Sequence, residues 1–281
     1  MPSVSTIDLH CHSSASDGVL SATDLVRRAA GNGVEFLSLT DHDTLQGLSL
    51  ASKDAAGFGM RFVNGVEISC EWGGGQVHIL GYAFDSSDAA LNRGLADIRS
   101  GRVDRARRMA LDLEKAGIPG CFEGAMRYAE NRELINRAHF ARYLVEIGIC
   151  RDVRRVFDVY LIPGRPGYVP YRWASVKDAV RWILDAGGVA SIAHPGRYKF
   201  SRNRLHSFFE EFKDGGGQAL EVVSGSHSPD EIVKFGRLAA EYNFAASCGS
   251  DFHGPDESYS DLGRIPPIPA ALTPVWEMFR K

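Results

Sequence analysis

Several features common in other protein classes are missing from this chain of 281 residues. No apolar run approaches the roughly 18 residues that a membrane span requires. The start, MPSVSTIDLH, has no basic stretch followed by an apolar one, as a secretory signal would have. The five cysteines are an odd, scattered set without a CxxC pair. These absences predict a cytoplasmic protein with reduced thiols, and they argue against a disulfide framework.

Short strand-like runs alternate with helical patterns along much of the chain. Helices are indicated at 21–33, at 175–188, with Ser175 as a possible N-cap, and at 229–243. This alternation predicts an α/β fold with a parallel sheet or barrel. The seven strand-like runs are 6–12, 35–41, 61–68, 76–82, 188–194, 219–224 and 244–250.

One connection in this pattern predicts a hairpin instead of a helix. The runs 61–68 and 76–82 are joined by a short link that contains three consecutive glycines, Gly73 to Gly75. If the turn centres near Trp72 and Gly73, Glu67 and His78 lie opposite each other on one face.

Residues 95–170 interrupt the alternation with helical material that ends in a segment rich in proline and glycine. We therefore expect a barrel domain made of residues 1–94 and 171–281, with residues 95–170 inserted as a helical subdomain.

The inserted segment is basic, whereas the rest of the chain is acidic. Residues 93–172 contain 16 Lys and Arg against 10 Asp and Glu, and the remainder contains 16 against 25. This division suggests an anionic ligand held beside a carboxylate-rich centre. The alternative is a solvated helix face, because Arg102, Arg105 and Arg108 lie off the apolar stripe of their predicted helix.

Histidines and carboxylates gather where the predicted strands end. His10 and His12 are two residues apart on a strand, so their imidazoles point the same way. Taken alone, this pair fits either a metal site or a solvated polar face. Six of the nine histidines, however, lie at strand ends or on the hairpin. Because sites form at the carboxyl ends of parallel strands, this predicts a multinuclear metal centre.

Six motifs resemble those of the PHP family, the polymerase and histidinol phosphatase group of metal-dependent phosphoesterases. They are DLHCHSSASDG, LSLTDHDT, NGVEIS, QVHILGY, SIAHPGR and GSDFHG, and they cover residues 8 to 254 apart from the insertion. The resemblance implies a distorted seven-stranded (β/α) barrel that holds up to three metals at its carboxyl face.

The resemblance also implies how the ligands divide among two or three divalent metals. The family pattern often has histidine where this chain has Asp17. Mixed imidazole and carboxylate ligands suit Mn²⁺, Zn²⁺ or Fe²⁺, and the absence of cysteine ligands favours Mn²⁺. The three ligand sets are His10, His12, Glu67 and Asp251; His78 and His194 with Glu67 bridging; and Asp17, His42 and His253.

Closely spaced cations make a nucleophile available from water near neutral pH and bind phosphoryl oxygens. Asp251 is the first candidate to orient that nucleophile or accept its proton. His194 and His253 are the other catalytic candidates, and Asp43 could act as a hydrogen-bond partner of a histidine ligand.

Three further segments, NRAHFAR, GYVPY and HPGRY, resemble the PHP branch that acts on nucleoside 3′,5′-bisphosphates and on short RNA 5′ ends. Arg137 and Arg197 are suited to bidentate phosphate binding, although surface ion pairs are the alternative. His139 and His227 are additional candidates for substrate binding. We expect a phosphatase that removes the 3′-phosphate from a bisphosphate nucleotide.

Four other functions are compatible with parts of the pattern. A 5′–3′ exonuclease or phosphodiesterase on short RNA would use the same metal chemistry. A histidinol-phosphate phosphatase would require an acidic patch to bind its cationic substrate. Arg137 and Arg197 argue against this function. A non-catalytic metal-binding module would accompany a polymerase, and no such sequence is present. A metal-dependent amidohydrolase typically uses a bridging lysine, and no lysine falls at a predicted strand end. The sequence indicates neither a membrane nor a stable protein partner.

Overall fold

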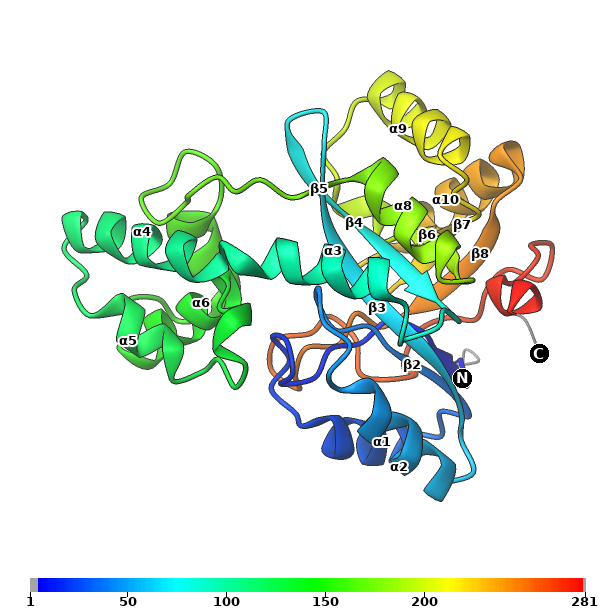
Figure 1. The fold of residues 1–281 in the computed structure, drawn as a ribbon, viewed down its shortest axis with the longest axis horizontal. Coiled ribbons are helices and arrows are strands. Elements are labelled where there is room, and N and C mark those ends of the chain that lie inside the picture. Colours follow the sequence, from blue (N-terminus) through cyan, green and yellow to red (C-terminus); the bar gives the residue numbers. More distant parts are fainter. Residues whose placement is uncertain (1–4, 280–281) are drawn as a thin grey trace.

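The computed structural model describes residues 5–279, which form eight strands and ten α-helices (Figure 1). The strands are β1 (Ile7–Asp8), β2 (Phe36–Leu39), β3 (Arg61–Trp72), β4 (Gly75–Tyr82), β5 (Ala174–Ser175), β6 (Val189–Ile192), β7 (Ala219–Ser224) and β8 (Ala245–Gly249). The helices are α1 (Ala22–Gly31), α2 (Leu48–Gly57), α3 (Ala89–Ser100), α4 (Arg102–Lys115), α5 (Cys121–Met126), α6 (Arg137–Glu146), α7 (Val153–Val156), α8 (Val176–Asp185), α9 (Arg202–Asp214) and α10 (Pro229–Tyr242).

Seven strands form one curved sheet in the order β1-β2-β3-β4-β6-β7-β8, and the two-residue β5 pairs with β3. All pairs along this path are parallel except those of β4, which is antiparallel to both β3 and β6. The sheet nearly closes, because the N–H of Leu9 donates to the carbonyl of Cys248 at 3.0 Å. The seven predicted runs all contain strands, and the predicted α/β barrel is confirmed. The prediction did not include β5.

The hairpin between β3 and β4 has a different register from the predicted one. Its turn is centred on Gly73 and Gly74, which both have positive φ, so Glu67 pairs with Leu80 and His78 pairs with Ser69. A shift of one residue in the turn offsets each pair by two, and a two-residue offset keeps a side chain on the same face. Glu67 and His78 therefore share a face diagonally, and their side chains still meet.

The predicted helix starts are marked by serine caps. Ser21, Ser175 and Ser228 each accept a hydrogen bond from the backbone N–H three residues further on, at the starts of α1, α8 and α10. Such a cap satisfies one of the N–H groups that have no partner inside the helix.

Helices cover the outside of the barrel, while β-strand side chains fill its interior. Figure 1 shows α1 and α2 along one side and α8, α9 and α10 along another. A large cluster of buried apolar residues lies between these helices and the sheet. A smaller cluster joins Leu9, Leu80 and Val189 to Val275 and Phe279 near the carboxyl end of the chain.

The segment from α4 to α7 packs around a hydrophobic cluster of its own, between Ala106 and Val169, and Figure 1 shows it set to one side of the barrel. In helix α4, two arginines that lie off the predicted apolar stripe are buried. Arg102 and Arg105 are 3% and 4% exposed, whereas Arg108 is exposed. A solvated helix face is therefore the wrong interpretation for Arg102 and Arg105.

Two glycines in helix interiors give opposite expectations for substitution by alanine. A Cβ at Gly94 in α3 would lie 2.6 Å from the ring of Trp182 in α8, whereas one at Gly236 in α10 would meet its nearest atom at an ordinary 3.5 Å. We expect Gly94→Ala to lower the free energy of unfolding by about 1–3 kcal/mol through overpacking. Gly236→Ala should raise it by about 0.5–1 kcal/mol through helix propensity.

Denaturant titrations of the two variants measure both changes under the same conditions. A Gly94→Ala variant as stable as the unmodified protein would contradict the close packing of α3 on α8.

Candidate metal centre

The nine predicted metal ligands lie together at one end of the barrel. His10 and His12 follow β1, and His42 follows β2 and bridges to β3 at Glu67. His194 lies two residues after the end of β6, and Asp251 and His253 follow β8. Eight of the nine fall into compact groups of possible donor atoms, and His194 contacts one of these groups through Glu67.

The first group consists of His10, His12, Glu67 and Asp251, which are all buried. The Nε2 atoms of His10 and His12 lie 3.4 and 3.3 Å from Glu67 Oε2. The same two atoms lie 3.4 and 3.3 Å from Asp251 Oδ1. Donor atoms bound at about 2.0–2.1 Å around one tetrahedral cation are separated by about this distance. The four side chains thus have the spacing of a single cation site.

The second group is centred on the carboxylate of Glu67, which is fully buried. Its Oε1 lies 2.9 Å from both His78 Nδ1 and His194 Nε2. Its Oε2 also lies 3.2 Å from His42 Nδ1. Each oxygen therefore faces a different set of imidazoles, which is the arrangement of a carboxylate between two cation sites.

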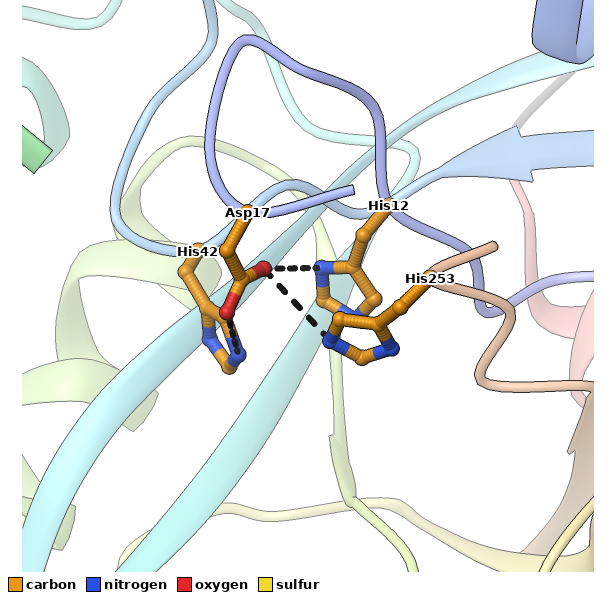
Figure 2. A group of neighbouring side chains, drawn as sticks. All are labelled: His12, Asp17, His42 and His253. Atoms are coloured by element: carbon orange, nitrogen blue, oxygen red, sulfur yellow. Dashed lines mark ion pairs between the residues drawn. The ribbon is translucent and has the colours of Figure 1, made fainter. Parts of the chain in front are cut away.

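The third group is looser and surrounds Asp17, whose side chain points between three imidazoles in Figure 2. Asp17 Oδ1 lies 3.4 Å from His253 Nε2 and 3.9 Å from His12 Nδ1, and Oδ2 lies 3.9 Å from His42 Nε2. A residue from the insertion also reaches this carboxylate, because Asn136 Nδ2 donates to Asp17 Oδ2 at 2.9 Å.

Burial and neighbouring charge act in opposite directions on these groups. Burial would raise the pKa of the Glu67 carboxyl, but His78, His42 and His10 hold it well below its usual range. Burial would lower the pKa of His12, yet the neighbouring carboxylates of Asp251 and Glu67 raise it to about 10. For His42, burial dominates and lowers the pKa to about 3. The neighbouring imidazoles thus favour the ionised form of the Glu67 carboxyl.

The donor atoms fit divalent cations. Several buried atoms of the centre have no hydrogen-bond partner, which is rare for buried polar groups unless an ion or water satisfies them. A mixed set of imidazole nitrogens and carboxylate oxygens suits Mn²⁺, Zn²⁺ or Fe²⁺. These atoms include His10 Nε2, both ring nitrogens of His12, Glu67 Oε2 and Asp251 Oδ1.

Two aspartates beside His42 support the centre without joining it. Asp41 accepts hydrogen bonds from the N–H and hydroxyl of Ser13 and from the hydroxyl of Ser16, and so holds the loop that carries Asp17. Asp43 accepts from the N–H of Ser69 and pairs with Arg102. The predicted contact of Asp43 with a histidine ligand is therefore not among its hydrogen bonds.

A cavity of about 260 Å³ opens beside the centre, between the barrel and the insertion. Asp17, His42, His78, Asp251 and His253 line it on the barrel side. The insertion contributes basic and amide side chains on the other side, namely Arg102, Arg105, Asn136 and Arg137. Of these, only Arg137 was among the sequence candidates. The sequence did contain a signal for Arg102 and Arg105, because two arginines three residues apart share one face of a helix and can line the same site.

The other predicted substrate contacts divide into two kinds. Arg197 lines the cavity, and its guanidinium lies 2.6 Å from Asp251 Oδ2. His139 is 1% exposed and accepts a hydrogen bond from the N–H of Asn136 inside the capping box of α6. His227 stacks on Phe235 and accepts from the N–H of Gly196. Neither histidine lines the cavity.

Comparison with known proteins identifies the family of this chain. The sequence pattern of the PHP domain family matches residues 8–188, which is more than half of the chain. The chain belongs to the PHP domain family. The resemblance predicted from the six motifs is therefore confirmed. The match begins at the first residue of the DLHCHSSASDG motif and spans the insertion.

Among PHP relatives, a 3′,5′-nucleoside bisphosphate phosphatase from Chromobacterium violaceum is 50% identical over 97% of this chain and 96% of its own. A 5′-3′ exoribonuclease from Haemophilus influenzae is 40% identical over 97% of this chain and 98% of its own. A solved structure from C. violaceum, described as an amidohydrolase with bound sulfate and no metal, has a TM-score of 0.95 at 49% identity. The alignment covers 98% of this chain and 95% of the C. violaceum chain.

Within residues 5–279, no helix combines the length and the apolar composition needed to cross a membrane.

Substitutions at Glu67 and Asp17 distinguish a carboxylate shared by two cation sites from one that belongs to a single site. Protein purified without chelator should contain more than one equivalent of divalent metal. Glu67→Gln should lose more than one equivalent, because Glu67 faces donors from two groups, and Asp17→Asn should lose at most one. Elemental analysis of both variants measures these losses.

Thermal unfolding of each variant in chelator shows whether the metal-free fold survives. A folded Glu67→Gln variant with full metal content would contradict the role of Glu67.

Proposed function

We propose that this PHP protein is a metal-dependent phosphatase that removes the 3′-phosphate from nucleoside 3′,5′-bisphosphates. The observation that carries the proposal is one cavity with two chemically different sides. One side is formed by the carboxylates and imidazoles of the candidate metal centre, and the other by buried arginines. The relative named a 3′,5′-nucleoside bisphosphate phosphatase supports the same substrate class.

The arginine side of the cavity is suited to a phosphate that does not react. Arg137 donates to Gln76 Oε1 and to the carbonyl of Leu161, and Arg105 donates to the carbonyl of Val169. Within residues 5–279, no carboxylate lies within ion-pair distance of either guanidinium. Burial, with Arg137 and Arg102 nearby, lowers the pKa of Arg105 to about 9. Arg105 is buried and Arg137 is partly buried, and cations removed from water without a counter-charge favour a bound anion.

Arg197 has a different proposed role from the one expected from the sequence. Its ion pair with Asp251 puts its charge at the metal centre, so we assign it to the phosphate that is hydrolysed. The bound sulfate in the C. violaceum structure belongs to that protein, and it supports anion binding by this fold.

We propose that two or three divalent cations, preferably Mn²⁺, occupy the three donor groups. His10, His12, Glu67 and Asp251 would hold one, His78 and His194 with Glu67 a second, and Asp17, His42 and His253 a third. When bound, such cations lower the pKa of water and stabilise the charge that develops during phosphoryl transfer.

Asp251 is the proposed catalytic residue of this chain, since its two oxygens face different partners. Oδ1 faces the imidazoles of His10 and His12, whereas Oδ2 faces Arg197 at the cavity. This carboxylate can therefore orient a water molecule toward a phosphate and accept its proton. His253, whose Nδ1 lies 3.6 Å from Asp251 Oδ1, and His194 are the further catalytic candidates.

We also propose that residues 95–170 form a subdomain that caps the substrate. Arg142 of α6 pairs with Glu257 of the barrel and also donates to the carbonyl of Asp17. Arg102 reaches Asp43 from α4. These contacts hold the arginine side of the cavity at a fixed distance from the metal centre, which would select for the separation of two phosphates.

A second candidate function, 5′–3′ degradation of short RNA, is favoured by one specific feature. A larger hollow of about 890 Å³ adjoins the cavity and shares Phe157, Arg197 and Tyr259 with it. Arg151, Arg154 and Arg155, which do not line the first cavity, line this hollow, where the backbone of a longer strand could extend.

Replacing Asp251 tests the catalytic assignment. Asp251→Asn keeps the size of the side chain but cannot accept a proton, so kcat for phosphate release should fall about 10²-fold or more. Metal content and melting temperature are measured on the same preparation. Near-normal kcat in a folded variant that retains its metal would show that Asp251 is dispensable.

Arginine variants test recognition of a second phosphate. A charge-assisted contact is worth about 1.5–3 kcal/mol, so Arg105→Ala and Arg137→Ala should each lower kcat/KM for a bisphosphate about 10- to 100-fold. The kcat/KM for a 3′-monophosphate should change much less, because this substrate leaves the arginine side empty.

Arg108→Ala, on the exposed side of the same helix as Arg105, is the matched control and should change neither value. Equal losses for both substrates in the Arg105 and Arg137 variants would contradict two-phosphate recognition. A loss confined to oligoribonucleotides would instead favour the RNA function.

A further inference from the structure

Glu221 is a buried carboxylate in contact with the metal centre that belongs to none of the donor groups. It lies on β7, whose six residues are all buried, and its exposed fraction is 0%. A charged residue in such a strand needs specific partners, because an unpaired buried carboxylate is strongly unfavourable. Both of its oxygens have them, and each partner is a proposed metal ligand.

The first partner is the ring of His10. Glu221 Oε1 lies 2.9 Å from His10 Nδ1. A carboxylate oxygen can accept a hydrogen bond from this nitrogen, so Nδ1 is engaged by Glu221 and Nε2 is the ring nitrogen left to bind a cation. Nε2 is the atom that faces Glu67 and Asp251 in the first donor group. Glu221 thus selects the tautomer of His10 that can bind a cation there.

The second partner is the backbone of His194. Glu221 Oε2 accepts the N–H of His194 at 2.5 Å. His194 has φ of 24°, an unfavourable conformation for a residue with a side chain, and it begins the short turn Pro195–Arg197. This hydrogen bond stabilises the conformation in which His194 Nε2 lies 2.9 Å from Glu67 Oε1.

We infer that Glu221 is a positioning residue that orients one ligand in each of the two cation sites sharing Glu67. It fixes His10 by its ring and His194 by its backbone, from a strand that contributes no ligand itself. The inference rests on the proposed metal centre, but it does not depend on which phosphate ester is the substrate.

Glu221→Gln is the test, because it keeps the shape of the side chain. Its amide oxygen can still accept from His194, but its NH₂ group then faces His10 Nδ1 and favours the hydrogen on Nε2. Metal affinity should fall about 10- to 100-fold, as is typical for loss of a carboxylate behind a ligating histidine. Titration of the metal-free protein with Mn²⁺ and with Zn²⁺ measures this change. Nitrogen NMR of the imidazoles should show the changed tautomer of His10.

Ser247 offers a matched control. It is the neighbour of Glu221 on β8, it is fully buried, and its hydroxyl bonds to that of Ser191. Ser247→Ala should lower the melting temperature but leave metal affinity and the His10 tautomer unchanged. Unchanged metal affinity in folded Glu221→Gln would overturn the inference. Absence of phosphatase activity in the unmodified protein would overturn the proposed function alone, since the metal titration needs no substrate.

Discussion

The structure depends on the burial of one carboxylate, that of Glu67, among imidazoles from four other parts of the barrel. Its oxygens lie 2.9 to 3.4 Å from nitrogens of His10, His12, His42, His78 and His194. Removing a carboxylate from water costs several kcal/mol unless opposite charge and hydrogen bonds compensate. The ends of the strands must therefore meet closely enough to supply that compensation, and bound cations would complete it. The strained backbone at His194 and Asp251, both with positive φ, shows that local conformation is subordinate to this convergence.

We propose that the insertion makes a reaction site out of this buried cluster. Its side chains reach the barrel through the Asn136–Asp17 hydrogen bond and the Arg142–Glu257 ion pair. The cavity therefore lies between two parts of the chain that pack around separate hydrophobic clusters. A metal centre alone would accept many phosphate esters. In the proposed function, the arginines of the insertion add a second requirement, a further negative charge on the same substrate.

The sequence predicted those parts of the molecule that depend on local periodicity. Strand ends could be found from alternating apolar residues, and this placed His10, His12 and Glu67 at one end of the predicted barrel. The exact pairing of β3 with β4 could not be predicted, because three consecutive glycines allow several turn positions. Arg105 looked like a surface residue, since only tertiary packing turns that face of α4 inward. Glu221 gave no signal as part of the site, because its role depends on neighbouring strands far away in the sequence.

The most direct test of the account compares two substrates of the unmodified protein with Mn²⁺ present. Phosphate release is measured for a nucleoside 3′,5′-bisphosphate and for the matching 3′-monophosphate, over a range of concentrations that gives kcat/KM for each. The account predicts a value about 10- to 100-fold higher for the bisphosphate, because only that substrate occupies both sides of the cavity. Equal values would contradict it and would leave the buried arginines of the insertion without their proposed role.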